Sequence, residues 1–128
     1  MNSSFIFAII ALFCFFNFSS QQMPGGYTPI TTAEVYNDPN AEAALKFGAN
    51  FVVANLTSTS VIPPGNYSVA EIISAAQQVV KGMNYQFEVE ITNKAQTEVF
   101  DALYVVFRDL NGNQQVNSWS YTPPNYSL

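Results

Sequence analysis

The chain has 128 residues, of which 48% are hydrophobic, and this length and composition are typical of one small globular domain. Its formal net charge is −5 with only 4 lysine and arginine residues, so it lacks the cationic surface that binding to a phosphate backbone requires. It contains no histidine and a single cysteine, Cys14, which excludes most general bases, thiol nucleophiles and zinc ligands. We therefore expect no cofactor, no metal and no nucleic-acid partner.

The first 20 residues carry no charged side chain and include a run of Phe, Ile, Ala and Leu. The run is too short to favour a membrane-spanning helix and is typical of a secretory signal peptide, here cleaved between Ser19 and Gln22. Removal of residues 1–20 leaves a chain without cysteine, which depends on its hydrophobic core rather than on disulfides. We expect a protein that is secreted, or held in the lumen of the secretory, lysosomal or vacuolar pathway, with no membrane association after cleavage. An uncleaved anchor is the alternative.

Residues 21–36 are rich in Pro, Gly and Thr and predict a flexible N-terminal arm. A helix is then expected to begin at Asp38, which can cap it, with Pro39 in its first turn. Phe47 projects away from the apolar side of this helix and is either covered by the edge of a wrapping sheet or exposed. Gly48 indicates a close backbone approach. The apolar stripe consists of Ala41, Leu45, Gly48, Ala49, Val52 and Leu56, with Ala44 and Phe51 at its edge.

Strand signals follow the loop at residues 57–66, where two prolines and a glycine end the helix. Apolar and polar residues alternate over 83–92, as in a half-buried antiparallel strand. Residues 97–110 are apolar on both faces in their middle and predict a central strand. Asn-Gly-Asn then predicts a hairpin turn into a last strand at 114–121. One helix followed by about four strands predicts an α+β domain over residues 37–122, with 123–128 as a C-terminal tail.

Glu88 and Glu90 are the candidate catalytic pair, because residues two apart in a strand share a face and paired carboxylates can hydrolyse glycosides. The apolar residues between and around them favour a solvated outer face instead. The sequence contains no nucleotide-binding loop or nucleophile elbow. We predict that the protein is not an enzyme, with a carboxylate hydrolase as a competing hypothesis.

Sequons for N-glycosylation occur at Asn55, Asn66 and Asn125. Asn66 lies in the Pro/Gly loop, where we expect it to be the most accessible of the three. Short sequons arise readily by chance, so each is a candidate site.

The stretch QQVVKG, residues 77–82, places apolar residues where a polar turn is expected. Val79 and Val80 are either strand residues covered by the sheet or an exposed apolar hairpin tip. The longer stretch SAAQQVVKGMNY resembles the first inhibitory hairpin of the cystatins, protein inhibitors of papain-like cysteine proteases. Gln78, Val80 and Gly82 meet the family pattern Gln-x-Val-x-Gly. PGGYTPI resembles the family's glycine-bearing N-terminal segment and ALKFGANF its helix, so the resemblance covers residues 24–121.

The resemblance implies a cystatin-like fold, in which one long helix packs on, and is wrapped by, a four- to five-stranded antiparallel sheet. It also implies a reversible, competitive inhibitor whose N-terminal glycine segment and two hairpin loops block the active-site cleft of a papain-like, cathepsin-type protease. Gly25 or Gly26 would be the arm glycine. Val79 and Val80 would form the apolar tip, prepared for binding by the hairpin, with Lys81 as a charge at its rim.

The second hairpin departs from the family pattern. Many cystatins carry Pro-Trp there, whereas this turn contains Asp109, Leu110 and Asn111, with Leu110 as its apolar anchor. Trp119, the only tryptophan, belongs by its spacing to the last strand. The loop resembles that of stefin-type members, which also lack disulfides. The alternative function is a cystatin-fold binding or structural module without inhibitory activity. We expect a monomer, with a dimer swapped through the first hairpin as the physical alternative.

Overall fold

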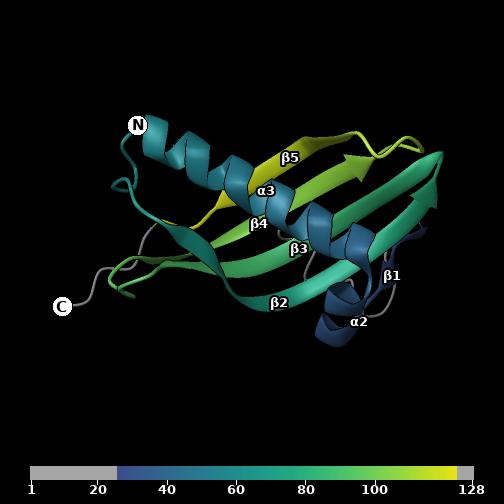
Figure 1. Ribbon diagram of the computed structural model, residues 1–128, viewed down its shortest axis with the longest axis horizontal. Helices are drawn as coiled ribbons and strands as arrows, with labels where there is room; N and C mark the ends of the chain where they lie inside the picture. The colour runs from purple at the N-terminus through teal and green to yellow at the C-terminus, as the bar shows by residue number, and fades with distance from the viewer. Residues whose placement is uncertain (1–25, 124–128) are drawn as a thin grey trace.

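The computed structural model describes residues 26–123 as an antiparallel sheet of five strands, in the order β1-β2-β3-β4-β5, with helix α3 lying across one face (Figure 1). This confirms the predicted α+β class and the helix packed on a four- to five-stranded sheet. The predicted signal peptide, Gly25, Asn125 and residues 124–128 of the tail lie outside the described residues. The elements are β1 (Thr28–Pro29), α2 (Thr32–Asn37), α3 (Pro39–Ser58), β2 (Tyr67–Val80), β3 (Gly82–Asn93), β4 (Val99–Arg108) and β5 (Gln114–Tyr121).

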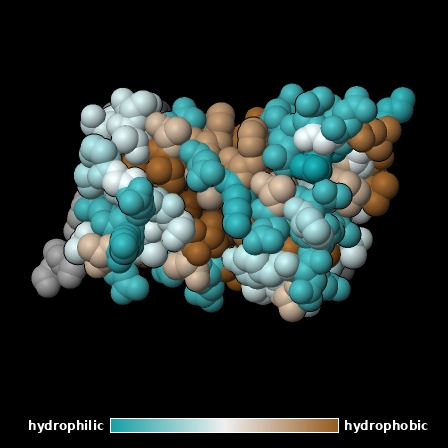
Figure 2. Space-filling model, in the orientation of Figure 1, coloured by the Kyte–Doolittle hydropathy of each residue, from teal (hydrophilic) through white to brown (hydrophobic). Residues whose placement is uncertain are grey.

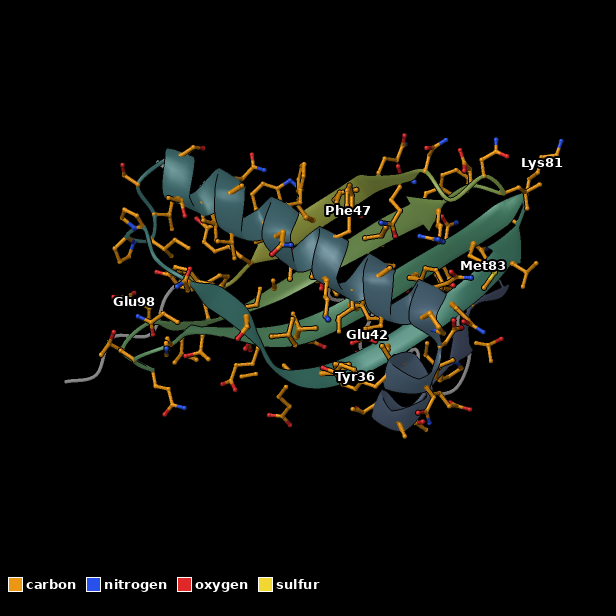
Figure 3. The ribbon with its side chains drawn as sticks, in the orientation of Figure 1. Tyr36, Glu42, Phe47, Lys81, Met83 and Glu98 are labelled. Carbon is orange, nitrogen blue, oxygen red and sulfur yellow. The ribbon has the colours of Figure 1, made fainter. Side chains whose placement is uncertain are left out.

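Helix α3 begins where the Asn-Asp-Pro motif predicts. The Asp38 carboxylate accepts hydrogen bonds from the backbone N–H groups of Asn40 (2.9 Å) and Ala41 (3.4 Å), and Pro39 is the first helical residue. Phe47, which stands off the predicted stripe, is partly buried against the core on the side of α3 nearest β5 (Figure 3). The buried residues of the helix are those of the predicted stripe together with Ala44: Ala41, Ala44, Leu45, Gly48, Ala49, Val52 and Leu56.

Helix α3 and the sheet approach each other closely at Gly48. A Cβ atom added there would overlap the ring of Tyr104 on β4, so the predicted close approach is confirmed. The Tyr104 phenol donates a hydrogen bond of 2.6 Å to the backbone carbonyl of Leu45. Burial raises the pKa of Tyr104, which keeps this hydroxyl protonated and able to donate. The long aromatic side chain therefore reaches the helix backbone only because residue 48 has no side chain.

The segment before α3 contains regular structure, and the expectation of a flexible arm up to residue 36 is corrected here. β1 pairs antiparallel with β2, with Thr28 opposite Gln77. α2 begins with a capping box: the Thr31 hydroxyl accepts from the Glu34 N–H (3.1 Å), and the Thr31 N–H donates to the Glu34 carboxylate (2.7 Å). Val35 on this helix is 0% exposed. The composition rich in Pro, Gly and Thr predicted no regular structure here, although this segment forms a short capped helix that places one valine in the core.

The strands carry the predicted alternation. On β3, Tyr85, Phe87, Val89 and Ile91 are all buried in the core under α3. Trp119 lies on β5, as its spacing predicted, and packs edge-on against Phe51 of α3 with ring centroids 6.1 Å apart. Within residues 26–123, no helix combines the length and apolar character needed to cross a membrane.

Candidate functional site

The turns β2–β3 and β4–β5 lie side by side at one end of the sheet (Figure 1). Val79 is 77% exposed, Val80 42% and Leu110 77%, although all three are large hydrophobic residues. Figure 2 shows hydrophobic side chains gathered at this end of the molecule. We call Val79, Val80 and Leu110 the hairpin-tip surface. Their exposure excludes the alternative in which the sheet covers both valines.

Gly82 makes a close contact between the turns of the two hairpins, just beyond the end of the β3–β4 ladder. Its φ of +123° lies in a region that L-residues with side chains rarely adopt. A Cβ atom on Gly82 would lie 2.5 Å from the carbonyl oxygen of Arg108 and 3.1 Å from the Cα of Asp109. The glycine of the Gln-x-Val-x-Gly pattern is therefore buried between the hairpins and sets how closely they approach.

The stem behind the first tip is closed by a side-chain pair. Gln78 and Asn84 stand directly opposite each other on β2 and β3, and the Asn84 amide donates to the Gln78 carbonyl oxygen at 2.8 Å. Lys81 is the one residue between the two strands, and its exposed side chain projects outward at this end (Figure 3). Gln78 belongs to the Gln-x-Val-x-Gly pattern, whereas Asn84 was not predicted as a site residue, although it lies in the same stretch, SAAQQVVKGMNY.

The second tip is built by Asp109. Its carboxylate accepts from the backbone N–H groups of Asn111 (2.8 Å) and Asn113 (2.9 Å) and from the Asn113 side-chain amide (3.2 Å). These hydrogen bonds, above all the one from the Asn113 backbone, hold the pKa of Asp109 below its usual value. Gly112 adds the positive φ of +90° that completes the turn. Asp109 is thus engaged within its own loop, and Leu110 is the side chain that the loop presents outward.

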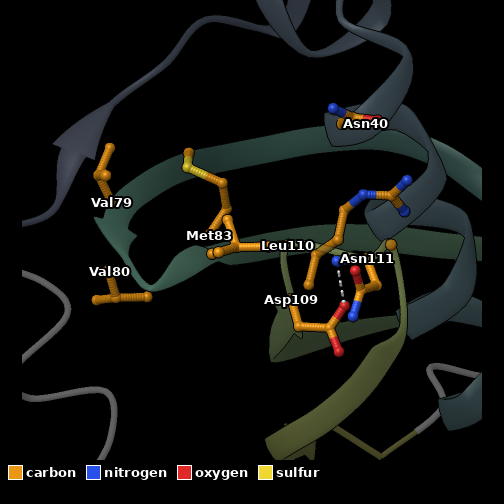
Figure 4. Close-up of a pocket in the computed structure, with 10 residues that line it drawn as sticks. Asn40, Val79, Val80, Met83, Asp109, Leu110 and Asn111 are labelled. Atoms are coloured by element: carbon orange, nitrogen blue, oxygen red, sulfur yellow. Dashed lines mark hydrogen bonds between the residues drawn. The ribbon is translucent and has the colours of Figure 1, made fainter.

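A shallow groove of about 490 Å³ runs between the two tips (Figure 4). Met83 lies on the apolar side of β3 and packs partly against the core, and it also lines the groove. No local pattern indicates Asn40 or Arg108, because only the tertiary fold brings α3 and the end of β4 to this place. The groove is lined by Asn40, Val79, Val80, Gly82, Met83, Arg108, Asp109, Leu110, Asn111 and Gly112.

The start of the described chain lies at the same end of the molecule. Because Thr28 stands opposite Gln77 in an antiparallel pair, Tyr27 and Gly26 lie on the side of Thr28 toward Val79. Gly26 is exposed and has a φ of +84°. Apart from its chain neighbours, no described residue has an atom within 4 Å of where its Cβ would be. The described chain thus begins on the β1 side of the hairpin-tip surface, and Figure 4 shows this strand beside Val79.

The carboxylate pair lies elsewhere, on the outer face of the sheet. Glu88 and Glu90 are both partly buried, so the predicted outer face is confirmed but full solvation is not. Burial, and next the nearby Asp101, raise the pKa of Glu88. Among the described residues, no group of three or more His, Cys, Asp and Glu is arranged to hold a metal ion.

A family model described as the cystatin domain matches residues 33–121. The chain therefore belongs to the cystatin family, as the sequence resemblance indicated. Among solved structures it is similar to the salivary cystatin from the soft tick Ornithodoros moubata, at 18% sequence identity and a TM-score of 0.49. That alignment covers 77% of this chain and 98% of the tick protein. No curated protein matches the chain.

Proposed function

We propose that this cystatin-family protein is a reversible, competitive inhibitor of papain-like cysteine proteases of the cathepsin type. Family membership supports this class of activity. The single observation that carries the proposal is the hairpin-tip surface, where Val79, Val80 and Leu110 stand exposed on two adjoining turns. Isolated large hydrophobic residues are common on surfaces, but three at adjacent tips at one end favour a binding surface.

The physical basis of inhibition is a rigid apolar wedge. The valines stand on a hairpin fixed by its strand ladder, by the Gln78–Asn84 pair and by the contact of Gly82 with the neighbouring hairpin. Little conformational entropy is therefore lost when the valines enter an apolar cleft, so burial of their side chains appears as affinity.

The remaining parts have separate roles in the wedge. Leu110 supplies the apolar contact of the second loop, flanked by Asp109 and Asn111. Lys81 stays at the solvated rim. The segment that contains Gly25 and Gly26 lies along the non-primed side of the cleft, where a residue without a side chain lets the backbone approach the enzyme closely. We propose that this activity is exerted in the secretory pathway or outside the cell, because the composition of residues 1–20 is typical of a signal peptide.

The competing function is a cystatin-fold binding or structural module without inhibitory activity. The observation in its favour is that the second tip presents a single aliphatic side chain, Leu110, and no aromatic residue. Interface hot spots are enriched in aromatic residues, so this loop contributes less affinity than a tryptophan would. An intact first tip argues against the alternative.

Steady-state inhibition of papain tests the proposal. Purified residues 21–128 should raise the apparent KM for a small peptide substrate and leave kcat unchanged, as a competitive inhibitor does. The variant Val79→Ser/Val80→Ser should inhibit at least tenfold less. Ile73→Ser is the matched control, because Ile73 is 46% exposed on the same strand but outside the hairpin-tip surface. Undiminished papain activity in the presence of micromolar wild-type protein would exclude the proposed inhibitory function.

A further inference from the structure

Asn66 lies at the opposite end of the molecule from the hairpin-tip surface. It precedes β2 in the Pro-Pro-Gly loop, and its backbone carbonyl accepts a hydrogen bond of 3.2 Å from the N–H of Lys94 in the β3–β4 turn. β2 then runs for 14 residues to Val80. At about 3.3 Å per residue, Asn66 and Val80 stand roughly 45 Å apart along the strand.

The geometry of Asn66 differs from that of the helical sequon. Asn66 and Ser68, the two sequon residues that a glycosyltransferase reads, are both exposed, and in residues 26–123 no hydrogen bond to the Asn66 side chain is found. The Asn55 amide, in contrast, donates to the Phe51 carbonyl at 2.9 Å within α3. Leu56, the middle residue of that sequon, is 2% exposed in the core.

We propose that Asn66 carries an N-linked glycan and that Asn55 does not. The co-reactant is an oligosaccharide linked to a lipid pyrophosphate. The Asn66 Nδ2 atom forms a bond to the anomeric carbon of the sugar, the bond from that carbon to the pyrophosphate breaks, and the amide proton passes to a base of the transferase. The loop projects at the end away from the β2–β3 and β4–β5 turns, so the glycan leaves the hairpin-tip surface free.

Expression of the full chain in a eukaryotic secretory host tests this site by mass spectrometry before and after enzymatic deglycosylation. In an Asn125→Gln background, the protein should carry one glycan, which both Asn66→Gln and Ser68→Ala remove and Asn55→Gln retains. A glycan on Asn55, or an unmodified Asn66, would overturn the proposal. Masses are read independently of protease inhibition, so the result does not depend on the proposed function.

A second observation concerns the outer face of the sheet. Ala76 is 2% exposed, Gln86 5% and Leu103 4%, although none of them belongs to the core cluster under α3. Tyr27, the residue after Gly26, is half-buried and lines a hollow of about 300 Å³ together with Gln86 and Leu103. The Tyr27 side chain therefore packs on the face opposite the helix.

We infer that Tyr27 is a positioning residue for the N-terminal segment, an inference that rests on the proposed function. Its ring fixes the chain immediately after Gly26, and so fixes the point at which the N-terminal segment joins the fold. A residue that acts in this way has its effect only when those preceding residues are present.

A double-mutant cycle separates this role from a purely structural one. Tyr27→Ala should weaken papain inhibition about tenfold in residues 21–128 and have no effect in a chain that begins at Gly26. Tyr27→Phe should retain inhibition in both. An equal loss in the long and the short chain, or no loss in either, would overturn the inference. If the wild type does not inhibit, the proposed function fails instead.

Discussion

Gly82 and Arg108 are in contact through their backbones: a Cβ atom on Gly82 would stand 2.5 Å from the Arg108 carbonyl oxygen. This contact joins the turn that carries the two valines to the strand that leads into the Leu110 turn. The spacing of the hairpin-tip surface is thus set by the absence of one side chain. A rigid spacing matters because both tips must fit a single cleft at the same time.

Gly82→Ala should separate the two hairpins and strain the backbone at a φ of +123°. Residues held in such unfavourable backbone regions cost on the order of 1–3 kcal/mol. We expect a lower midpoint in urea unfolding and at least a tenfold loss of papain inhibition. Gly65→Ala is the control, because a Cβ there would meet only a Tyr67 ring carbon at 3.7 Å. Equal inhibition by wild type and Gly82→Ala would contradict this role.

Leu110→Ser should weaken inhibition without lowering stability, because the side chain is 77% exposed in the free protein. Burial of a leucine side chain is worth about 1.5–3 kcal/mol, which corresponds to a loss of roughly 10- to 100-fold in affinity. Leu110→Met retains an apolar side chain and should inhibit nearly as well as the wild type. An unchanged inhibition constant for Leu110→Ser would show that the second tip does not contact the protease.

Gly48→Ala sets helix propensity against packing. Alanine favours a helix by about 1 kcal/mol over glycine, but the added Cβ overlaps the Tyr104 ring. Overpacking of a core costs about 1–3 kcal/mol, and displacement of the ring also breaks its hydrogen bond to Leu45. We therefore expect a net loss of stability in thermal and urea unfolding. A variant more stable than the wild type would mean that Tyr104 can move away from the helix at little cost.

The free energy of unfolding should depend on pH through the carboxylates of Glu88 and Asp101 on the outer face of the sheet. The pKa of Glu88 is raised by burial and then by Asp101, and that of Asp101 by burial and then by Glu71. Each group then binds protons more tightly in the folded state than in the unfolded state. Their contribution to the free energy of unfolding is therefore greatest at low pH and declines as pH rises from the ordinary carboxyl pKa through the raised one.

Glu88→Gln removes one of these groups and tests the effect by difference. The variant should gain stability relative to the wild type at neutral pH, and this gain should shrink on acidification. Urea titrations of both proteins across the carboxyl range measure it, and subtraction cancels the opposite contribution of Asp109, whose pKa is lowered. A constant difference in the free energy of unfolding at every pH would show that folding does not raise the pKa of Glu88.

The parts of the fold that the sequence predicted were those encoded locally. The Asp38 cap, the apolar stripe of α3 and the alternation of β3 each depend on a short pattern that the fold does not override. The capping box of α2 was equally local, but six residues are too few for a helical period, and Val35 alone indicated burial. Glu88 shows a different limit. The alternation predicts which face of the sheet it lies on, but its raised pKa depends on burial and on Asp101, which lies on another strand.

The residues of the candidate site also fall into two groups, those that a sequence pattern predicted and those that only the tertiary fold brings in. Gln78 and Gly82 were found through the family pattern, and Val79 and Val80 because apolar residues stood where a turn was expected. Asn40, Met83 and Arg108 line the same groove but come from three separate elements. Their meeting is a product of the tertiary fold, which no local pattern encodes.

Direct binding to papain tests the central claim that the hairpin-tip surface occupies the protease cleft. Calorimetry should compare papain whose active-site thiol carries a small alkyl group with papain whose cleft is filled by a covalent peptide inhibitor. We predict tight binding to the first enzyme and none to the second. Equal binding to both enzymes, or binding to neither, would mean that the hairpin-tip surface does not occupy the cleft.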